Sequence, residues 1–192
     1  MKPLQTLKHA VSAAVVTLVL CSPAACTSEP QWADPEAHEK TEQLQRECVP
    51  LMVGTWHYEV LGDKHRFFER LTFKADSTFT GYRKWQSRSL VTVDGQEVYT
   101  DWKDNEEECG AFMGSWQLYY GQPIGGGEKR NLLSLRASFV DEDNFVLHRP
   151  LPYSFISDFG YVDTTTLCFQ GFYFADADGW TVYSRGEAEP SF

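Results

Sequence analysis

The chain has 192 residues, 15% of them aromatic, and a formal net charge of −10 at pH 7. Its length predicts one domain preceded by a short processed segment. The negative charge argues against a nucleic-acid partner, because phosphates are bound by clusters of Lys and Arg, and it also disfavours electrostatic binding to anionic lipid.

Residues 1–25 have the features of a secretory signal peptide. Lys2 and Lys8 precede an apolar run from Ala10 to about Leu20, and small residues follow it. This run is shorter than the roughly 20 apolar residues that span a bilayer. Cleavage after residue 25 removes two lysines and no acids, so the formal charge becomes −10 − 2 = −12. We therefore expect the protein to be exported.

Cys26 directly follows Ala24 and Ala25 and begins a polar tether, residues 26–33. The order is similar to a lipobox, with Pro23 where such a motif usually has Leu or Val. It predicts lipidation at Cys26 and a lipid-anchored protein of the bacterial cell envelope, at the outer membrane or the periplasmic face. A triacylated cysteine buries enough methylenes for stable anchoring. Ordinary signal-peptidase cleavage near residue 25 is the alternative.

Three cysteines remain in the rest of the chain: Cys48, Cys109 and Cys168. They form no CxxC pair and no histidine stands near them, so neither a metal site nor a cofactor is expected. In an oxidising compartment two of them can pair, and spacing does not show which two. Alternatively, all three are small buried hydrophobic side chains.

A helix is predicted over residues 34–50. Asp34 is a capping carboxylate and Pro35 suits the first helical position. One face of this helix carries Ala37, Thr41, Leu44 and Cys48. Pro50 is expected to end it.

From residue 53 the pattern changes to strict alternation. About nine strand-like segments follow, at 53–60, 66–74, 78–86, 89–102, 114–120, 131–140, 144–149, 164–174 and 179–185. The segment 89–102 reads as a hairpin around Asp94-Gly95. So many successive alternating strands predict an antiparallel sheet that closes on itself. We expect an all-β, up-and-down barrel over residues 51–187, with the short N-terminal helix before it and a C-terminal tail at 188–192.

An immunoglobulin-like sandwich is the structural alternative. It would show Greek-key spacing and a Cys-Trp-Cys pattern, which does not suit Cys48 standing ahead of the first strand.

The order of these elements resembles the lipocalin/calycin superfamily, and more closely the lipocalin-like lipoproteins of Gram-negative bacteria. The matching residues are Gly54-Thr55-Trp56, LTFKADSTF at 71–79, Gly114-Ser115-Trp116 and Arg185. The resemblance covers residues 50–186. It implies that Gly54, Trp56 and Arg185 are structural, with the indole closing one end of the barrel under the guanidinium. Such a stack contributes about 0.5–2 kcal/mol.

The resemblance also implies a small hydrophobic ligand inside the barrel. The candidate ligand-binding residues are Tyr58, Glu69, Phe73, Phe79, Arg83 and Trp85. Arg83 is predicted either to pair with Glu69 or to hold the acidic head group of a lipid-like molecule. The alternatives are that the aromatic residues fill the core, and that a register change places Glu69 and Arg83 in solvent.

No catalytic motif is evident: GxSxG is absent, and no histidine stands in the context of a nucleophile. We expect a non-catalytic binder of a small amphiphile. The alternative function is a protein-interaction module, such as an inhibitor or accessory subunit of an envelope complex. It would use residues 149–163, which read as a long connection containing Tyr153, Phe155, Phe159 and Tyr161. The alternative for this segment is a buried crossover that packs on the barrel.

Overall fold

The computed structural model describes residues 34–171, 174 and 178–192. The predicted signal peptide, the lipidation site Cys26 and the tether at 26–33 lie outside these residues.

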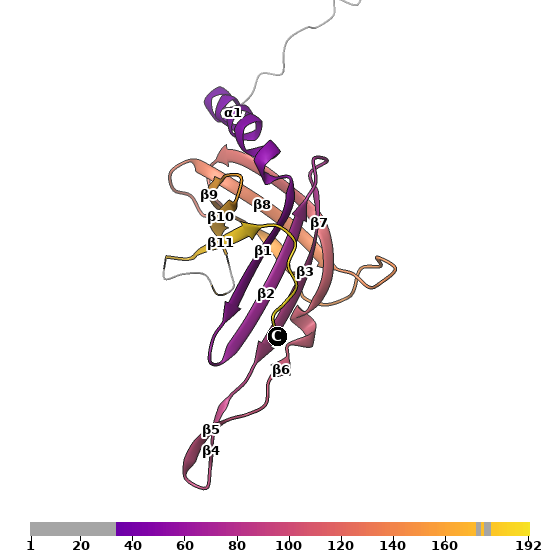
Figure 1. Ribbon diagram of the computed structural model, residues 1–192. Coiled ribbons are helices and arrows are strands. Elements are labelled where there is room, and N and C mark those ends of the chain that lie inside the picture. Colours follow the sequence, from indigo (N-terminus) through magenta and orange to yellow (C-terminus); the bar gives the residue numbers. More distant parts are fainter. Residues whose placement is uncertain (1–33, 172–173, 175–177) are drawn as a thin grey trace, which may run out of the picture. The chain divides into compact units, whose positions relative to one another are not determined.

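Eight antiparallel strands form a closed up-and-down barrel (Figure 1). They are β1 (Gly54–Leu61), β2 (His65–Phe73), β3 (Thr78–Ser87), β7 (Gly110–Gly121), β8 (Arg130–Phe139), β9 (Tyr153–Val162), β10 (Thr166–Gln170) and β11 (Trp180–Arg185). Each strand pairs with the next one along the chain, and β11 pairs with β1 to close the ring. The predicted all-β barrel is confirmed.

Between β3 and β7 the chain leaves the barrel. It forms a separate two-stranded hairpin from β4 (Leu90–Val93) and β5 (Gln96–Tyr99), and then the short β6 (Lys103–Asp104) and the 3-10 turn η1 (Glu106–Glu108). Asp94 and Gly95 have φ values of 52° and 78°. These positive angles suit the tight turn that the sequence predicts, since its twist matches that of the flanking strands.

The helix α1 (Pro35–Met52) precedes the barrel, as predicted. Its start is capped by Asp34, whose Oδ1 accepts a hydrogen bond from the Ala37 amide at 3.1 Å. The predicted end at residue 50 is wrong by two residues. Pro50 lies in the last turn, where its missing N–H forfeits a single helical hydrogen bond and the chain continues.

The apolar face of α1 packs on the core of the barrel. Leu44 and Met52 belong to the same buried cluster as Trp56 and Leu71. The strands contribute alternate residues to that cluster, as on β8, where the buried members are Leu133, Leu135, Ala137 and Phe139.

Two segments differ from their predictions. Residues 144–149 form no strand, and only an isolated bridge joins Val146 to Val140. The predicted connection at 149–163 is instead mostly strand β9, which pairs with both β8 and β10. Its Tyr153 and Phe159 are 4% and 6% exposed and belong to the core. The prolines before β9 and Ser157 on its inward side interrupted the apolar alternation that would have revealed it.

The predicted tail at 188–192 runs back over the outside of the barrel. Arg70 donates to the carbonyl of Ala188 at 3.1 Å, and the Ser191 amide donates to Glu59 Oε1 at 2.8 Å. The tail therefore lies along the outer face of β1 and β2.

Candidate functional site

Trp56 closes the end of the barrel on which α1 packs. The Arg185 guanidinium lies 4.8 Å from the centre of the indole. Its two terminal nitrogens donate to the carbonyls of Leu51 and Val53, each at 2.8 Å, and the indole Nε1 donates to the Met52 carbonyl at 2.8 Å. The stack that the resemblance implies is therefore present, and Trp56 is fully buried.

The contact between Arg185 and the start of β1 requires a glycine at position 54. Its φ is +133°, and an added Cβ would lie 2.9 Å from Nη2 of Arg185. Any larger residue would both strain the backbone and displace the guanidinium. These residues have a structural role at this end.

Glu69 and Arg83 form a buried ion pair inside the barrel. Nε and Nη2 of Arg83 lie 2.7 and 2.6 Å from Oε2 of Glu69. The hydroxyls of Tyr153 and Tyr183 both donate to Oε1 of Glu69, that of Tyr183 at 2.6 Å. Arg83 also contacts Glu108 Oε2 at 3.3 Å. Of the two predicted readings for Arg83, pairing with Glu69 is the one present.

This network is almost completely removed from water, since Arg83 is 0% and Glu69 1% exposed. Burial alone would lower the pKa of Arg83, but the negative charge of Glu69 outweighs it and raises that pKa above its ordinary value. Burial, and then the charge of Glu69, raises the pKa of Tyr153 and of Tyr183 well above the usual value. The arginine is therefore held charged and both tyrosines neutral.

These tyrosines predict a loss of stability at alkaline pH. Their pKa is raised in the folded state above about 10 in the unfolded chain, so their contribution is complete below pH 10 and declines as the pH rises further. Each should cost about 1.4 kcal/mol of unfolding free energy per pH unit in that range. Urea unfolding at pH 9, 10 and 11 measures the slope. Tyr153→Phe should reduce it, and an unchanged slope in a Tyr153→Phe/Tyr183→Phe variant would contradict this account.

The remaining predicted ligand residues fill the barrel. Phe73 and Phe79 stack with ring centres 5.5 Å apart and lie in the core. Toward the other end, the Tyr58 hydroxyl donates to the carbonyl of Phe174 at 2.5 Å, and the ring of Trp85 lies 5.6 Å from that of Phe174. All six predicted ligand-binding residues therefore lie in the barrel interior, where they contact other residues of the protein.

The cavity beside Glu69 has a volume of only about 10 Å³. That is the space of one water molecule, whereas small-molecule sites measure about 300–1,000 Å³. Sequence reasoning selected the inward residues correctly but could not decide whether they leave room.

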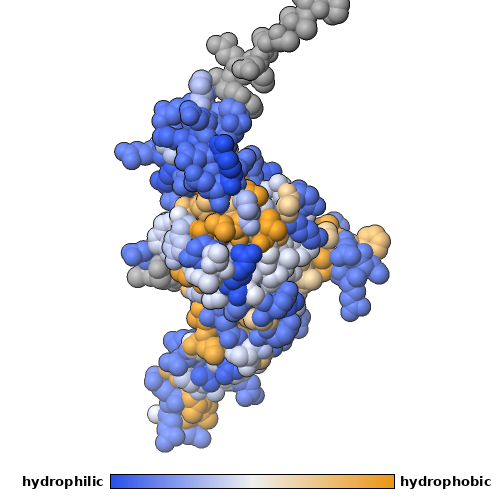
Figure 2. Space-filling model, turned by 45° about the horizontal axis from the view of Figure 1, so that its top comes forward, coloured by the Kyte–Doolittle hydropathy of each residue, from blue (hydrophilic) through white to orange (hydrophobic). Residues whose placement is uncertain are grey.

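The hairpin and its flanks, residues 89–102, form an arm that leaves the barrel (Figure 1). Figure 2 shows apolar side chains among hydrophilic ones on this projection, at the bottom of the view. Val91 pairs with Val98, and Val93 lies two residues further on the same face. These three side chains are 38%, 40% and 53% exposed, respectively. Sequence reasoning found the hairpin but not its exposure.

The root of the arm is fixed to the barrel. Nε of Arg88 donates to the carbonyl of Asp63 at 2.6 Å, and its guanidinium lies 4.4 Å from the ring centre of Trp102. The guanidinium of Arg66, on β2, lies 4.2 Å from the ring centre of the same indole. The arm therefore leaves the barrel from a fixed base, which lowers the entropy lost when it binds a partner.

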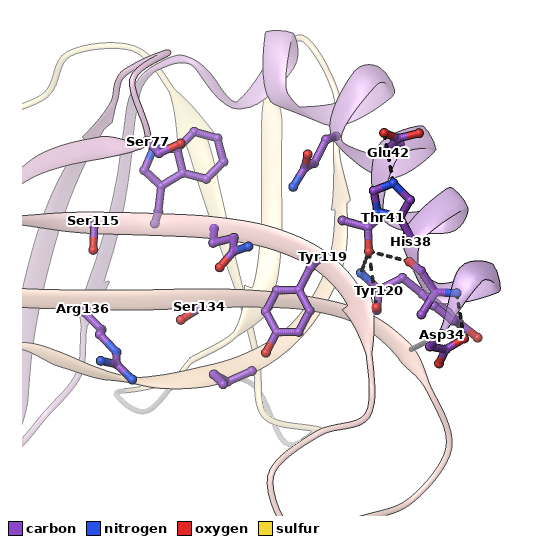
Figure 3. A pocket seen from close by; sticks show the side chains of 15 residues that line it. Asp34, His38, Thr41, Glu42, Ser77, Ser115, Tyr119, Tyr120, Ser134 and Arg136 are labelled. Carbon is purple, nitrogen blue, oxygen red and sulfur yellow. Dashed lines mark hydrogen bonds and ion pairs between the residues drawn. The ribbon is translucent and has the colours of Figure 1, made fainter. Parts of the chain in front are cut away.

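A groove of about 1030 Å³ lies beside α1 on the outside of the barrel. Figure 3 shows side chains from α1 on one side and from β7 and β8 on the other. The labelled residues are Asp34, His38, Thr41, Glu42, Ser77, Ser115, Tyr119, Tyr120, Ser134 and Arg136. Sequence reasoning missed this groove, and the available signal was the polar set of outward residues on β7 and β8.

No family model matches the chain, and no curated protein or solved structure matches it either. Within the residues that the structure describes, no cluster of three or more His, Cys, Asp or Glu side chains is placed to bind a metal ion. Nor does any helix in that part of the chain have the length and apolar character needed to cross a membrane.

Proposed function

We propose that this protein is a non-catalytic envelope lipoprotein whose barrel carries a protein-docking arm. The observation that supports this most is the exposed valine face of residues 89–102. Isolated two-stranded hairpins are at best marginally stable in water, and exposed apolar faces mark interaction sites. A partner strand or groove that covers Val91, Val93 and Val98 would remove this face from water.

The close packing around Glu69 in the described part of the barrel interior supports an interaction role over a carrier role. The barrel interior is packed around an ion pair and aromatic rings, with about 10 Å³ of space beside Glu69. Such a barrel is a rigid base for a surface element.

The charge of the arm indicates the kind of partner. It carries Asp94, Glu97 and Asp101 and no basic residue. Both β4 and β5 also have one unpaired edge, because they pair only with each other. The arm therefore suits a protein segment with branched apolar residues and flanking Lys or Arg, bound by strand addition or face packing. Two arms of the same chain would repel each other.

Photocrosslinking tests the arm. With p-benzoylphenylalanine replacing Val93, the full-length protein in its native host should give one discrete adduct, because Val93 is 53% exposed on the docking face. Purified wild-type protein should compete for this adduct. A Val91→Lys/Val98→Lys variant should compete at least 10-fold less well, because lysines would oppose a basic partner. Its unfolding free energy should change by only about 0.5 kcal/mol, since both positions are exposed.

The matched control carries the same photoreactive residue at Val182, which is 46% exposed on β11 outside the arm. Identical adducts from both positions, or equal competition by wild-type and lysine variant, would reject the docking role.

Binding of a small amphiphile is a second proposal. It follows from the resemblance, and the groove beside α1 favours it because its volume of about 1030 Å³ far exceeds that of about 10 Å³ for the cavity beside Glu69.

A further inference from the structure

Two arginines, Arg46 and Arg136, have no partner within the described part of the chain. The other seven arginines of the sequence make hydrogen bonds, ion pairs or cation–π contacts there. Arg136 lines the groove itself. Arg46 lines a neighbouring pocket of about 360 Å³, which shares Gln45, Trp116 and Gln117 with the groove. The arginines without a partner in the described residues therefore lie in two adjoining pockets of an acidic protein.

Serine hydroxyls surround Arg136 on the outer face of the sheet. In the register of the strands, Ser115 of β7 and Ser154 of β9 stand directly beside Arg136. Ser134 and Ser138 lie two residues away along β8, on the same face. None of these hydroxyls has a side-chain hydrogen bond within the described residues. Residues directly opposite each other on antiparallel strands, such as Ser115 and Arg136, have Cβ atoms about 4.5–5.5 Å apart. Together they offer several donors around one guanidinium.

The acidic side chains of the groove are already paired. Glu42 lies 3.3 Å from His38, and Asp34 lies 2.5 Å from Lys129 while it also caps α1. Among the acidic and basic side chains of the groove lining, Arg136 is therefore the one with no such contact within the described residues, and its guanidinium is complementary to an anion.

Apolar surface adjoins the arginine. Tyr119, Ile156 and the edge of Trp116 line the same groove, whose volume is at the upper end of the range for small-molecule sites. An acyl or aromatic body can lie along these side chains with its charged end at Arg136.

We propose that this groove binds a small amphiphile with a single oxyanion head, a phosphomonoester or a carboxylate, held by Arg136 and its serines. This inference specifies the second proposed function and is independent of the arm. Its recognition chemistry is a charge-assisted hydrogen bond from a planar guanidinium, reinforced by hydroxyl donors.

Titration calorimetry of the full-length protein with octyl phosphate, octanoate and uncharged octanol tests the site. Saturable binding is expected for one or both anions, and the preferred head group identifies the source of the oxyanion. Arg136→Gln should weaken that binding about 10-fold to 100-fold, the effect of losing one charge-assisted hydrogen bond. Arg136→Lys should retain part of it. Ser115→Ala/Ser134→Ala should weaken it severalfold.

Arg130→Gln is the matched control. Arg130 lies on the same strand, is exposed, and pairs with Asp158 outside the groove lining. The Arg130→Gln variant loses the same charge as Arg136→Gln but should bind the anionic probes as tightly as the wild type does. Equal weakening by both arginine variants, or none by either, would overturn the groove site and leave ligand binding elsewhere. Octanol binding as tightly as the anions would overturn oxyanion recognition, and no saturable binding of any probe would overturn both the site and the amphiphile function.

Discussion

Arg83→Met should lower the free energy of unfolding by about 3–5 kcal/mol, because it leaves a buried carboxylate without its cation. Glu69 is 1% exposed and, among the described residues, would keep only the hydroxyls of Tyr153 and Tyr183 as partners. Methionine matches the length of the arginine stem, so the packing loss is confined to the space of the deleted guanidinium carbon and its two terminal nitrogens. Urea unfolding followed by tryptophan fluorescence gives the value.

A double variant separates charge from packing. Adding Glu69→Gln to Arg83→Met removes the uncompensated charge and keeps an acceptor for both tyrosine hydroxyls. More than half of the lost stability should return, because paired removal of a buried ion pair is often close to neutral. A single variant within about 1 kcal/mol of the wild type would show that the ion pair is not the centre of the interior.

Trp56→Ala should cost about 3–5 kcal/mol, the usual loss for truncating a fully buried large aromatic. The indole fills the end of the core beside Leu44 and Met52, and it also supports Arg185. Thermal and urea unfolding of the variant measure the loss.

Trp102→Ala is the comparison, since Trp102 lies at the root of the arm and contacts Arg66 and Arg88. It should lose about 1 kcal/mol, the scale of an accessible cation–π contact. Similar losses in the two tryptophan variants would mean that Trp56 does not close the core.

Alternation along the strands was sufficient to predict the barrel, because one face of every strand must be buried. The same reasoning gave Glu69 the phase of Phe67 and Arg83 the phase of Phe79 but left open whether both point inward or into solvent. The structure has both buried. It failed at β9, whose inward positions include Ser157 and whose start follows Pro150 and Pro152.

Sequence patterns encode neither the volume that remains between side chains nor the contacts between residues on distant strands. Tyr153 and Tyr183 come from β9 and β11, and their contact with Glu69 depends on the register across the closed sheet. The groove at Arg136 likewise brings together three strands and α1. Such sites depend on residues far apart in sequence, so local patterns of two to four residues do not reveal them.

The ring of strands has a single seam between neighbours that are distant along the chain. Trp56 of β1 faces Arg185 of β11, 185 − 56 = 129 positions away, and only His57 and Ser184 form a second register pair. Every other junction in the ring joins consecutive barrel strands. The loop-closure entropy is therefore concentrated at this junction. The barrel is expected to form first from local hairpins, and the β1–β11 pairing is expected to form last. On heating, the same β1–β11 pairing is expected to open first.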